Sequence, residues 1–359
     1  MTIIATMIPH SRPSIENEDI QAATEVLRSH HLAQGALVEQ FERGMAAYLG
    51  LAGGVAVNSG TAALEVALRV LGIGAGDEVI LPSYVCAAPW LAVQRVGATP
   101  RLVDIELETF SIDPAAVREA LTSKTRAVIV PHLFGLPAHL TALERLGVPL
   151  IEDCAQTLGA LEQGRPVGSA GLLTVCSFYA TKLICAGEGG MVLSRDEALL
   201  ERARALREYD GAPSLNPAAT NLKMTDLQAA IGVAQLERVA SFLERRVWLA
   251  HEYATALKGA GVVQPIVPAG RSHVYYRFVV RVPDVPNNYD GLGEVIARFE
   301  GCRVQCRKPV FRSLHRYLGL EGFPASEEAE RTALSIPLFP ALADEEVAQI
   351  VTALRSEWS

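Results

Sequence analysis

The sequence VAVNSGTAALEVALRVL, residues 55–71, joins a short apolar run to a helical pattern through a polar turn. The apolar side chains of the pattern recur at i, i+3, i+4 and i+7, as on one face of a helix: Leu64, Ala67, Leu68 and Leu71. Short apolar runs and helical spacing go on alternating through about the first 235 residues. This alternation predicts an α/β fold with a mostly parallel sheet that helices cover on both faces.

Outward from this stretch, other apolar runs have the length of strands: Val79–Leu81, Leu102–Ile105, Ala127–Val130, Pro149–Ile151, Val175–Phe178 and Met191–Ser194. A long helical pattern then runs from Thr225 to Leu257. The elements expected after it are a strand at Tyr276–Val282 and helices near Leu292–Phe299 and Asp344–Leu354. We therefore expect a large domain over residues 1–236, whose N-terminal segment can pack on a smaller α+β domain over residues 237–359.

The composition is that of a chain that buries a core, because 50% of its 359 residues are hydrophobic and 20% are charged. A net charge of −8 disfavours sequence-independent binding to nucleic acid, which needs a surplus of Lys and Arg. The most apolar stretch, residues 170–187, contains Lys182 and is short of a membrane span. The N-terminus MTIIATMIPH lacks the basic region of a signal peptide. These features predict a cytoplasmic protein without a membrane anchor.

Cysteine spacing and the common nucleotide motifs argue against several classes of site. The six cysteines form no CxxC pair and stand at positions 86, 154, 176, 185, 302 and 306. This pattern predicts buried free thiols rather than a disulfide framework or a metal site. GIGAGD, residues 72–77, follows a helical pattern and breaks the GxGxxG spacing, so we interpret it as a helix end and loop. Neither a P-loop motif nor the GxSxG motif of α/β-hydrolases occurs.

The turn NSGT, residues 58–61, has the composition of a phosphate site at the start of a helix. Ser59 can cap the helix, and Gly60 lets a ligand approach the backbone. The hydroxyl of Thr61 lies beside the free N–H groups of the first turn. An ordinary helix cap explains the same residues, and for this motif alone it is the simpler interpretation.

Two charged residues stand at unusual places. IED, residues 151–153, ends an expected strand, and ligands of open α/β sheets bind outside the carboxyl ends of strands. Asp153 is therefore placed to meet a cationic ligand atom, with a helix cap as the alternative. Lys182 interrupts an apolar stretch, where a lysine needs a charged or covalent partner. A Schiff-base lysine is one interpretation, and a lysine that reaches the surface is the other.

These three features together match what pyridoxal 5′-phosphate needs, although none does so alone. The phosphate would dock on the helix N-terminus after Ser59. The carboxylate of Asp153 would pair with the pyridinium nitrogen and keep the ring an electron sink, and Lys182 would form the imine. The combination predicts an enzyme that uses this cofactor.

Nine stretches along nearly the whole chain carry a resemblance to a known family. They are LAQGALVEQFE (32–42), NSGTAALEVAL (58–68), GDEVILPSYV (76–85), GATPRLVDIE (97–106), PHLFG (131–135), IEDCAQTLGA (151–160), SFYATKLICAGEGGMV (177–192), NLKMTDLQAAIGVAQL (221–236) and LSIPLFP (334–340). In this order and spacing they resemble the DegT-type sugar aminotransferases, within fold-type I of the pyridoxal-phosphate enzymes. The resemblance implies a large domain with a mostly parallel mixed sheet, and a smaller α+β C-terminal domain.

The resemblance also implies a role for each matching site residue. Lys182 would hold the cofactor as an imine and move the proton, and Asp153 would pair with the ring nitrogen, so these two are the implied catalytic residues. Gln156 would lie near the ring hydroxyl of the cofactor. The phosphate would be held by a set of small and polar groups: Gly60, Thr61, the amide of Ala62, Ser177 and, from the other subunit of a homodimer, Asn221.

The sequence departs from the family pattern at two positions. Cys86 stands where members often place a bulky aromatic side chain against the cofactor ring, and a thiol offers less stacking area. Leu158 replaces the usual histidine after Asp153 and Gln156. Relatives that carry out dehydration have histidine in place of the lysine, so Lys182 favours transamination.

The expected reaction moves an amino group from an amino acid, glutamate or glutamine by resemblance, to a small-molecule keto sugar that is most often nucleotide-linked in this family. One alternative is amination of a keto-cyclitol, and another is a cofactor-bearing regulator without turnover. Several polar residues of the C-terminal part could face substrate, but surface or structural hydrogen bonding is the simpler interpretation: His273, Tyr275, Arg307 and His315.

Overall fold

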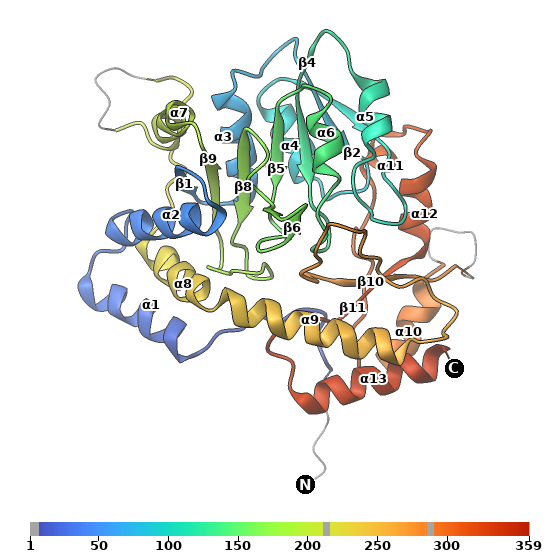
Figure 1. Cartoon of the computed structure of the whole chain (residues 1–359). Coiled ribbons are helices and arrows are strands. Elements are labelled where there is room, and N and C mark those ends of the chain that lie inside the picture. Colours follow the sequence, from blue (N-terminus) through green and yellow to red (C-terminus); the bar gives the residue numbers. More distant parts are fainter. Residues whose placement is uncertain (1–6, 211–215, 284, 286–290, 359) are drawn as a thin grey trace.

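A central seven-stranded sheet dominates the computed structural model in Figure 1, which describes residues 7–210, 216–283, 285 and 291–358. Across the sheet the strands lie in the order β1 (Gly53–Val57), β9 (Gly190–Ser194), β8 (Leu173–Ser177), β5 (Leu150–Asp153), β4 (Thr125–Pro131), β2 (Glu78–Pro82) and β3 (Thr99–Val103). Strands β8, β5, β4, β2 and β3 are parallel, whereas β9 is antiparallel to both of its neighbours. The mostly parallel mixed sheet confirms the expected α/β fold.

Helices cover both faces of this sheet, because alternate side chains of a strand point to opposite faces. Val79 and Leu81 of β2 pack in one core with α3 (Gly60–Val70), α4 (Ala88–Arg95) and α7 (Glu197–Arg207). Ile80, between them, packs in the opposite core with α5 (Pro114–Ala120) and α6 (Leu140–Glu144). On that face, α2 (Ala36–Leu49) contributes to a neighbouring core beside β1.

Apart from the cores that pack against the sheet, a separate core, here called the second core, lies along the long helix α9 in Figure 1. Its side chains come from residues 249–354, and Ile8 joins them from the start of the described chain. The N–H of Ile8 donates to Arg303 at 2.9 Å, and its carbonyl accepts from the N–H of Gln305 at 3.0 Å. The elements after the sheet are α8 (Asp226–Glu237), α9 (Val239–Ala256), β10 (Phe278–Arg281), α10 (Gly293–Gly301), α11 (Leu314–Leu318), α12 (Pro324–Thr332), β11 (Ala333–Ile336) and α13 (Asp344–Trp358).

Some elements differ from those expected. The long helical pattern is broken at Arg238, whose φ and ψ of −102° and 1° separate α8 from α9. Its guanidinium reaches the carboxylate of Asp19 in α1 (Asn17–Ser29), so a tertiary contact accompanies the break. β3 begins and ends earlier than expected because residues 99–103 pair in register with β2. A short hairpin, β6 (Leu161–Glu162) and β7 (Arg165–Pro166), was not expected either. The domain division expected after residue 236 falls at the end of α8 and stays a prediction.

The cysteines are only partly as expected. All six are free thiols, and Cys154, Cys176, Cys185 and Cys306 are buried. Cys86 and Cys302 are exposed, so the expectation of burial was wrong for these two. Cys302 closes α10 at the surface, and Cys86 lies in the loop after β2. Within the described ranges, none of the helices combines the length and apolar character of a membrane span.

Candidate active site

The carboxyl ends of the parallel strands bring distant parts of the sequence together. β5 ends at Asp153 and β8 at Ser177, and the turn after β8 carries Lys182. Gly190, the first residue of β9, pairs with both Val57 and Ser177, so β1 ends at the same edge. The first turn of α3 therefore opens at the edge that holds Asp153 and Lys182. This is the edge of open α/β sheets at which ligands bind.

The start of α3 is a capped helix end in close contact with β8 and β9. Ser59 Oγ accepts a hydrogen bond from the amide of Ala62 at 3.1 Å, so this amide already has a partner. A Cβ on Gly60 would lie 2.8 Å from the Cβ of Ser177. Gly190 is just as restricted, because a Cβ there would overlap the carbonyl of Ser59. The two glycines let the helix N-terminus and the hydroxyl of Ser177 share one small space.

Asp153 is a carboxylate held at the edge of the sheet. Its Oδ1 accepts from the N–H of Ala155 at 3.0 Å, and its backbone carbonyl accepts from His132 at 3.1 Å. Burial raises the pKa of Asp153, while the Ala155 hydrogen bond and the charge of Lys182 act in the opposite direction. A carboxylate in such a place is best stabilised by a cationic partner.

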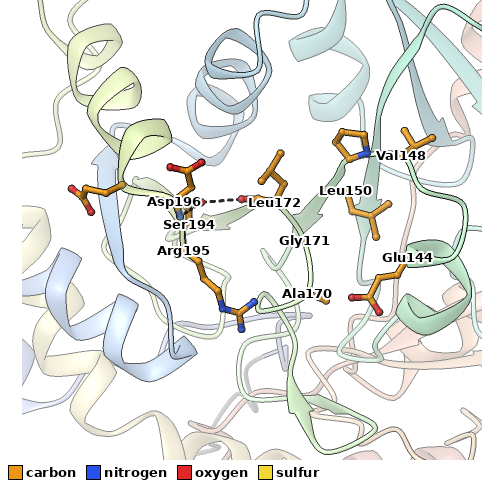
Figure 2. A pocket seen from close by; sticks show the side chains of 11 residues that line it. Glu144, Val148, Leu150, Ala170, Gly171, Leu172, Ser194, Arg195 and Asp196 are labelled. Atoms are coloured by element: carbon orange, nitrogen blue, oxygen red, sulfur yellow. Dashed lines mark hydrogen bonds between the residues drawn. The ribbon is translucent and has the colours of Figure 1, made fainter.

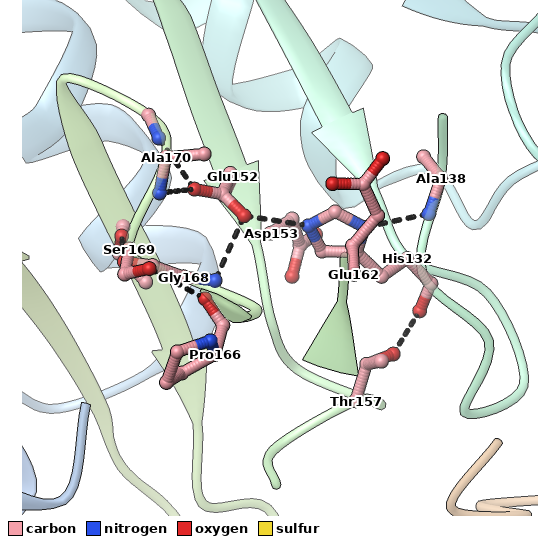
Figure 3. Close-up of polar contacts among 12 residues, drawn as sticks. His132, Ala138, Glu152, Asp153, Thr157, Glu162, Pro166, Gly168, Ser169 and Ala170 are labelled. Carbon is pink, nitrogen blue, oxygen red and sulfur yellow. Dashed lines mark hydrogen bonds and ion pairs between the residues drawn. The ribbon is translucent and has the colours of Figure 1, made fainter. Parts of the chain in front are cut away.

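The residue before it, Glu152, lies on the other face and anchors this strand end (Figure 3). Its fully buried carboxylate accepts from the backbone N–H groups of Gly168 at 2.8 Å, Ala170 at 2.7 Å and Gly171 at 2.5 Å. It also accepts from His132 Nε2 at 3.1 Å. Burial alone would raise the pKa of Glu152, but the hydrogen bonds from His132 and the backbone outweigh it and lower the pKa.

His132, Glu152 and Cys154 also place their possible ligand atoms within 4.8 Å of one another, which is close enough for a metal ion. Both ring nitrogens of His132 are already engaged, because Nδ1 accepts from the N–H of Ala138 at 3.0 Å while Nε2 donates to Glu152. Burial also raises the pKa of the Cys154 thiol well above its usual value, whereas metal binding needs a thiolate. His132 and Glu152 thus form a hydrogen-bond network beside Asp153, whose carbonyl accepts from the N–H of His132.

We expect Glu152→Gln to destabilise the fold by about 2–4 kcal/mol, because an amide cannot accept from three N–H groups and a histidine. Denaturation in urea at neutral pH measures this loss. The lowered pKa means that the carboxylate stabilises the protein above its unfolded pKa and loses that effect as the pH falls through the folded pKa. The gap between wild type and variant should therefore narrow in acid. Glu144→Gln, which affects only a surface ion pair with Arg165, should change the stability by less than about 1 kcal/mol. An equal loss in both variants would contradict the anchoring role.

Lys182 faces an aromatic ring from the second part of the chain. Its Nζ lies 5.3 Å from the ring centroid of Tyr276, and the Tyr276 hydroxyl lies 3.4 Å from Oγ1 of Thr181. Burial raises the pKa of both Asp153 and Cys86, and the positive charge of Lys182 opposes this rise in each. Lys182, Asp153 and Cys86 follow or end the parallel strands β8, β5 and β2 at the same carboxyl edge of the sheet.

Comparison with known proteins identifies the family of the chain. The model of the DegT/DnrJ/EryC1/StrS aminotransferase family matches residues 13–355. The chain belongs to this family. It is 36% identical to the dTDP-3-amino-3,4,6-trideoxy-α-D-glucose transaminase of Streptomyces venezuelae, over 95% of this chain and 93% of that protein. It is 35% identical to a UDP-N-acetyl-3-dehydro-α-D-glucosamine 3-aminotransferase of Acidithiobacillus ferrooxidans, over 88% and 86%.

A solved structure extends the likeness to the fold. The putative sugar aminotransferase of Streptococcus pneumoniae in its PLP-form superimposes with a TM-score of 0.91 at 26% identity, covering 98% of both chains. The protein is therefore an aminotransferase with the fold of the pyridoxal-phosphate sugar aminotransferases. The expectations from sequence for family, fold class and enzymatic activity are confirmed.

The residues at the carboxyl edge of the aminotransferase fit pyridoxal phosphate. A phosphate needs a helix start, hydroxyls and room beside the backbone, and α3, Thr61, Ser177 and Gly60 supply these. The Asp153 carboxylate suits a protonated ring nitrogen, and the amine of Lys182 suits an aldehyde. Gln156 follows Asp153 in the chain, and its Oε1 accepts from the N–H of Phe134 at 2.8 Å. Its role, like that of the Ala62 amide, stays a prediction.

The two departures from the family pattern have different surroundings. Leu158 is 2% exposed and packs in the apolar core beside α2, so a hydrophobic contact stands where the resemblance leads us to expect a polar group. Cys86 is exposed in the loop after β2. Desolvation by the surrounding protein raises the pKa of its thiol, and the charge of Lys182 opposes this rise. Its predicted place beside the cofactor ring stays a prediction.

Asn221 lies just before α8 and is exposed. Its Oδ1 accepts from the N–H of Lys223 at 3.3 Å, while the next residue, Leu222, accepts from the N–H of Asn58 at 2.8 Å. The segment is thus attached to the turn that precedes α3. Residues 211–215, which precede this segment, lie outside the described residues.

The aminotransferase also has a pocket of about 680 Å³ at the opposite edge of the sheet, shown in Figure 2. It is lined where β5 and β8 begin and β9 ends, and Ser194 Oγ donates there to the carbonyl of Leu172 at 2.9 Å. Glu144, Asp196 and Glu197 give it a negative lining, with Arg195 donating to the carbonyl of Ser169. None of the predicted site residues lines this pocket.

Sequence reasoning did not single out Tyr276, although its ring faces Lys182. Nothing local identifies it, since it lies in an apolar strand pattern and its partner Thr181 is 95 residues away. The expected structural roles of two other residues are confirmed. His273 Nδ1 accepts from the N–H of Tyr275 at 2.9 Å, and His315 Nδ1 is 2.7 Å from Ser83 Oγ.

Proposed function

We propose that this aminotransferase moves an amino group from an amino acid, glutamate or glutamine, to a keto sugar carried on a nucleotide. Two relatives that are 36% and 35% identical over most of their length bear names with dTDP- and UDP-linked amino sugars, which supports this substrate class. The observation that carries the reaction type is the meeting of Lys182, Asp153 and the first turn of α3 at one edge of the sheet. A cytoplasmic location remains part of the proposal.

The cofactor would be pyridoxal 5′-phosphate, which supplies delocalisation of the electron pair left when a C–H bond beside nitrogen breaks. Gly60, Thr61 and Ser177 would hold its phosphate, and Asp153 would hold its ring nitrogen protonated. Lys182 would anchor it covalently and, once released, would take the proton from the carbon that bears the amino group. The buried network around Glu152 would keep Asp153 in place during these steps.

A substrate screen tests the proposal directly. The purified enzyme would be incubated with glutamate or glutamine and with keto sugars linked to dTDP, UDP or GDP, and products would be followed by mass spectrometry. Formation of an aminated nucleotide sugar is the expected result. Turnover of a keto-cyclitol without a nucleotide, and of none of the nucleotide sugars, would assign the enzyme to the aminocyclitol alternative instead.

We further propose that the enzyme is a homodimer and that Asn221 reaches the phosphate of the partner's site. In a two-fold dimer each subunit lends what it borrows, so a Lys182→Ala subunit and an Asn221→Ala subunit place both lesions in one site of a mixed dimer. The other site is then intact. With random exchange about half of the dimers are mixed, and about a quarter of all sites should regain activity.

The mixing experiment has two controls. Native mass spectrometry must show that subunits have exchanged, and the Asn221→Ala dimer alone must be clearly impaired. Activity that stays at the level of the separate variants after exchange would mean that Asn221 acts within its own subunit, where its Oδ1 accepts from the N–H of Lys223.

A further inference from the structure

Tyr276 meets the reactive lysine from the opposite side of the site. Its side chain is 5% exposed, and its ring centroid lies 5.3 Å from Nζ of Lys182. Its hydroxyl contacts Thr181, the neighbour of that lysine. A cation near the face of a buried aromatic ring is attracted to it, so the lysine and the tyrosine constrain each other.

The backbone that carries Tyr276 is held tightly from two sides. Gly135, with φ of +104°, comes so close that a Cβ there would lie 2.6 Å from the amide nitrogen of Tyr276. The N–H of Arg277 donates to Phe134 at 3.1 Å. Tyr275 has φ of 49°, a strained conformation for a bulky residue, and its ring stacks on His273 at 4.0 Å. Such strain persists only where the surroundings impose it, and it often marks functional sites.

The charges around Tyr276 are mostly positive. Arg246 of α9 is buried and donates to the carbonyls of Tyr275 and Tyr276, and the guanidinium of Arg277 lies 5.0 Å from the Tyr276 ring. Burial raises the pKa of Tyr276, but Lys182 and Arg277, together with Thr181 and Arg246, lower it to about 8. His10 beside Arg277 adds no charge at neutral pH, because burial and Arg277 lower its pKa to about 3. Among the carboxylates, that of Asp153 is under the influence of the Lys182 charge, which acts to lower its pKa.

We propose that Tyr276 is a positioning residue for Lys182: its ring holds the amino group in the site and its hydroxyl stabilises the positive charge on that nitrogen. The inference rests on the backbone around Tyr276, where the strained Tyr275 and the close approach of Gly135 fix the position of the ring. Applied to catalysis, it rests on the function proposed above, because the held amine is the group that moves the proton. A phenol that loses its proton beside Lys182 would favour the cationic nitrogen most strongly.

The first test uses the protein without cofactor and does not depend on its activity. Tyrosine ionisation is followed by ultraviolet difference spectroscopy, and the titration of Tyr276→Phe is subtracted from that of wild type. One tyrosine should ionise near pH 8. In Lys182→Ala the same ionisation should move up by about one pH unit or more, because the neighbouring positive charge is lost. Thr181→Val, which removes only the hydrogen bond, should move it by less.

The second test uses the enzyme with its cofactor. In Tyr276→Phe the cofactor should still attach to Lys182, but the visible band of its protonated form should be lost at a pH lower by about 0.5–1 unit, since the charge-stabilising hydroxyl is gone. The half-reaction with glutamate should slow about tenfold or more. Tyr253→Phe is the matched control: it removes another buried hydroxyl, which donates to Pro337 at 2.9 Å, and it should leave the titration of the band unchanged.

Two results would overturn the proposal. One is an ionisation of Tyr276 that is the same in wild type and Lys182→Ala, and the other is a visible titration that is the same in wild type and Tyr276→Phe. Failure of the cofactor to attach to Lys182 in wild type would instead contradict the proposed function, and the cofactor-free titration would still decide whether Tyr276 and Lys182 are paired.

Discussion

Lys182→Ala should lose transamination almost completely, by about 10³-fold or more in kcat. The variant lacks both the covalent anchor and the group that moves the proton between the substrate carbon and the cofactor, and general acid–base catalysis alone contributes about 10²–10⁴-fold. Cofactor should still bind without a covalent bond, because the groups at α3 and Asp153 are unchanged. Stopped-flow absorbance of the half-reaction with glutamate measures the loss.

The same prediction can be checked without turnover. Borohydride treatment of the wild type should fix a pyridoxyl group on Lys182, which peptide mass spectrometry can locate. A label on Lys223 or Lys308 would contradict the assignment. Lys124→Ala serves as the matched control, because Lys124 is exposed and precedes β4, whose opposite end pairs with Asp153. Its activity should equal that of wild type.

Asp153→Asn should keep the cofactor but reduce kcat by about 10²-fold or more, which is the scale of losing one preorganised electrostatic partner. The substitution preserves the shape and the oxygen that accepts from Ala155, and it removes the charge. Because burial raises the pKa of Asp153, the carboxylate and a protonated ring nitrogen stabilise each other strongly. Steady-state kinetics and the cofactor absorption spectrum measure the two effects separately.

Asp113→Asn is the control for this variant. Asp113 Oδ1 accepts from the N–H of Ala115 at 2.8 Å at the start of α5, so it makes the same local hydrogen bond as Asp153 without facing Lys182. A change there should cost at most about 1 kcal/mol of stability and leave kcat alone. A near-normal kcat in Asp153→Asn would mean that Asp153 only makes its local hydrogen bond to Ala155, as Asp113 does to Ala115.

Local patterns predicted most of the sheet because most of its strands contain a short, buried, apolar run. Val79–Leu81 and Met191–Ser194 are recognised in this way, and both lie within the strands observed. The break at Arg238 could not be predicted, because a contact with Asp19, more than 200 residues away, accompanies it. The ends of β3 likewise depend on its register with β2 rather than on its own residues.

Some residues of the site can likewise be recognised from the local sequence, whereas others depend on contacts between distant segments. Lys182 and Asp153 stand out because a charge in or beside an apolar segment is conspicuous in the sequence. The network that supports Asp153 needs His132, Glu152 and the turn at 168–171 together, and the sequence does not show that these meet. Tyr276 is hidden for the same reason. The expected burial of Cys86 was wrong because a cysteine next to an apolar strand can still end in an open loop.

The pairing of Ile8 with Arg303 and Gln305 also affects how the protein is made. On the ribosome, Ile8 is made almost 300 residues before its partners. At ~5–20 residues per second, an interval on the order of 15–60 s separates the two. The sheet, which uses residues 53–194, can assemble during that time, whereas the second core cannot close around Ile8 until residues 249–354 have been made. Until then the apolar side chain of Ile8 has no place in the core that finally buries it.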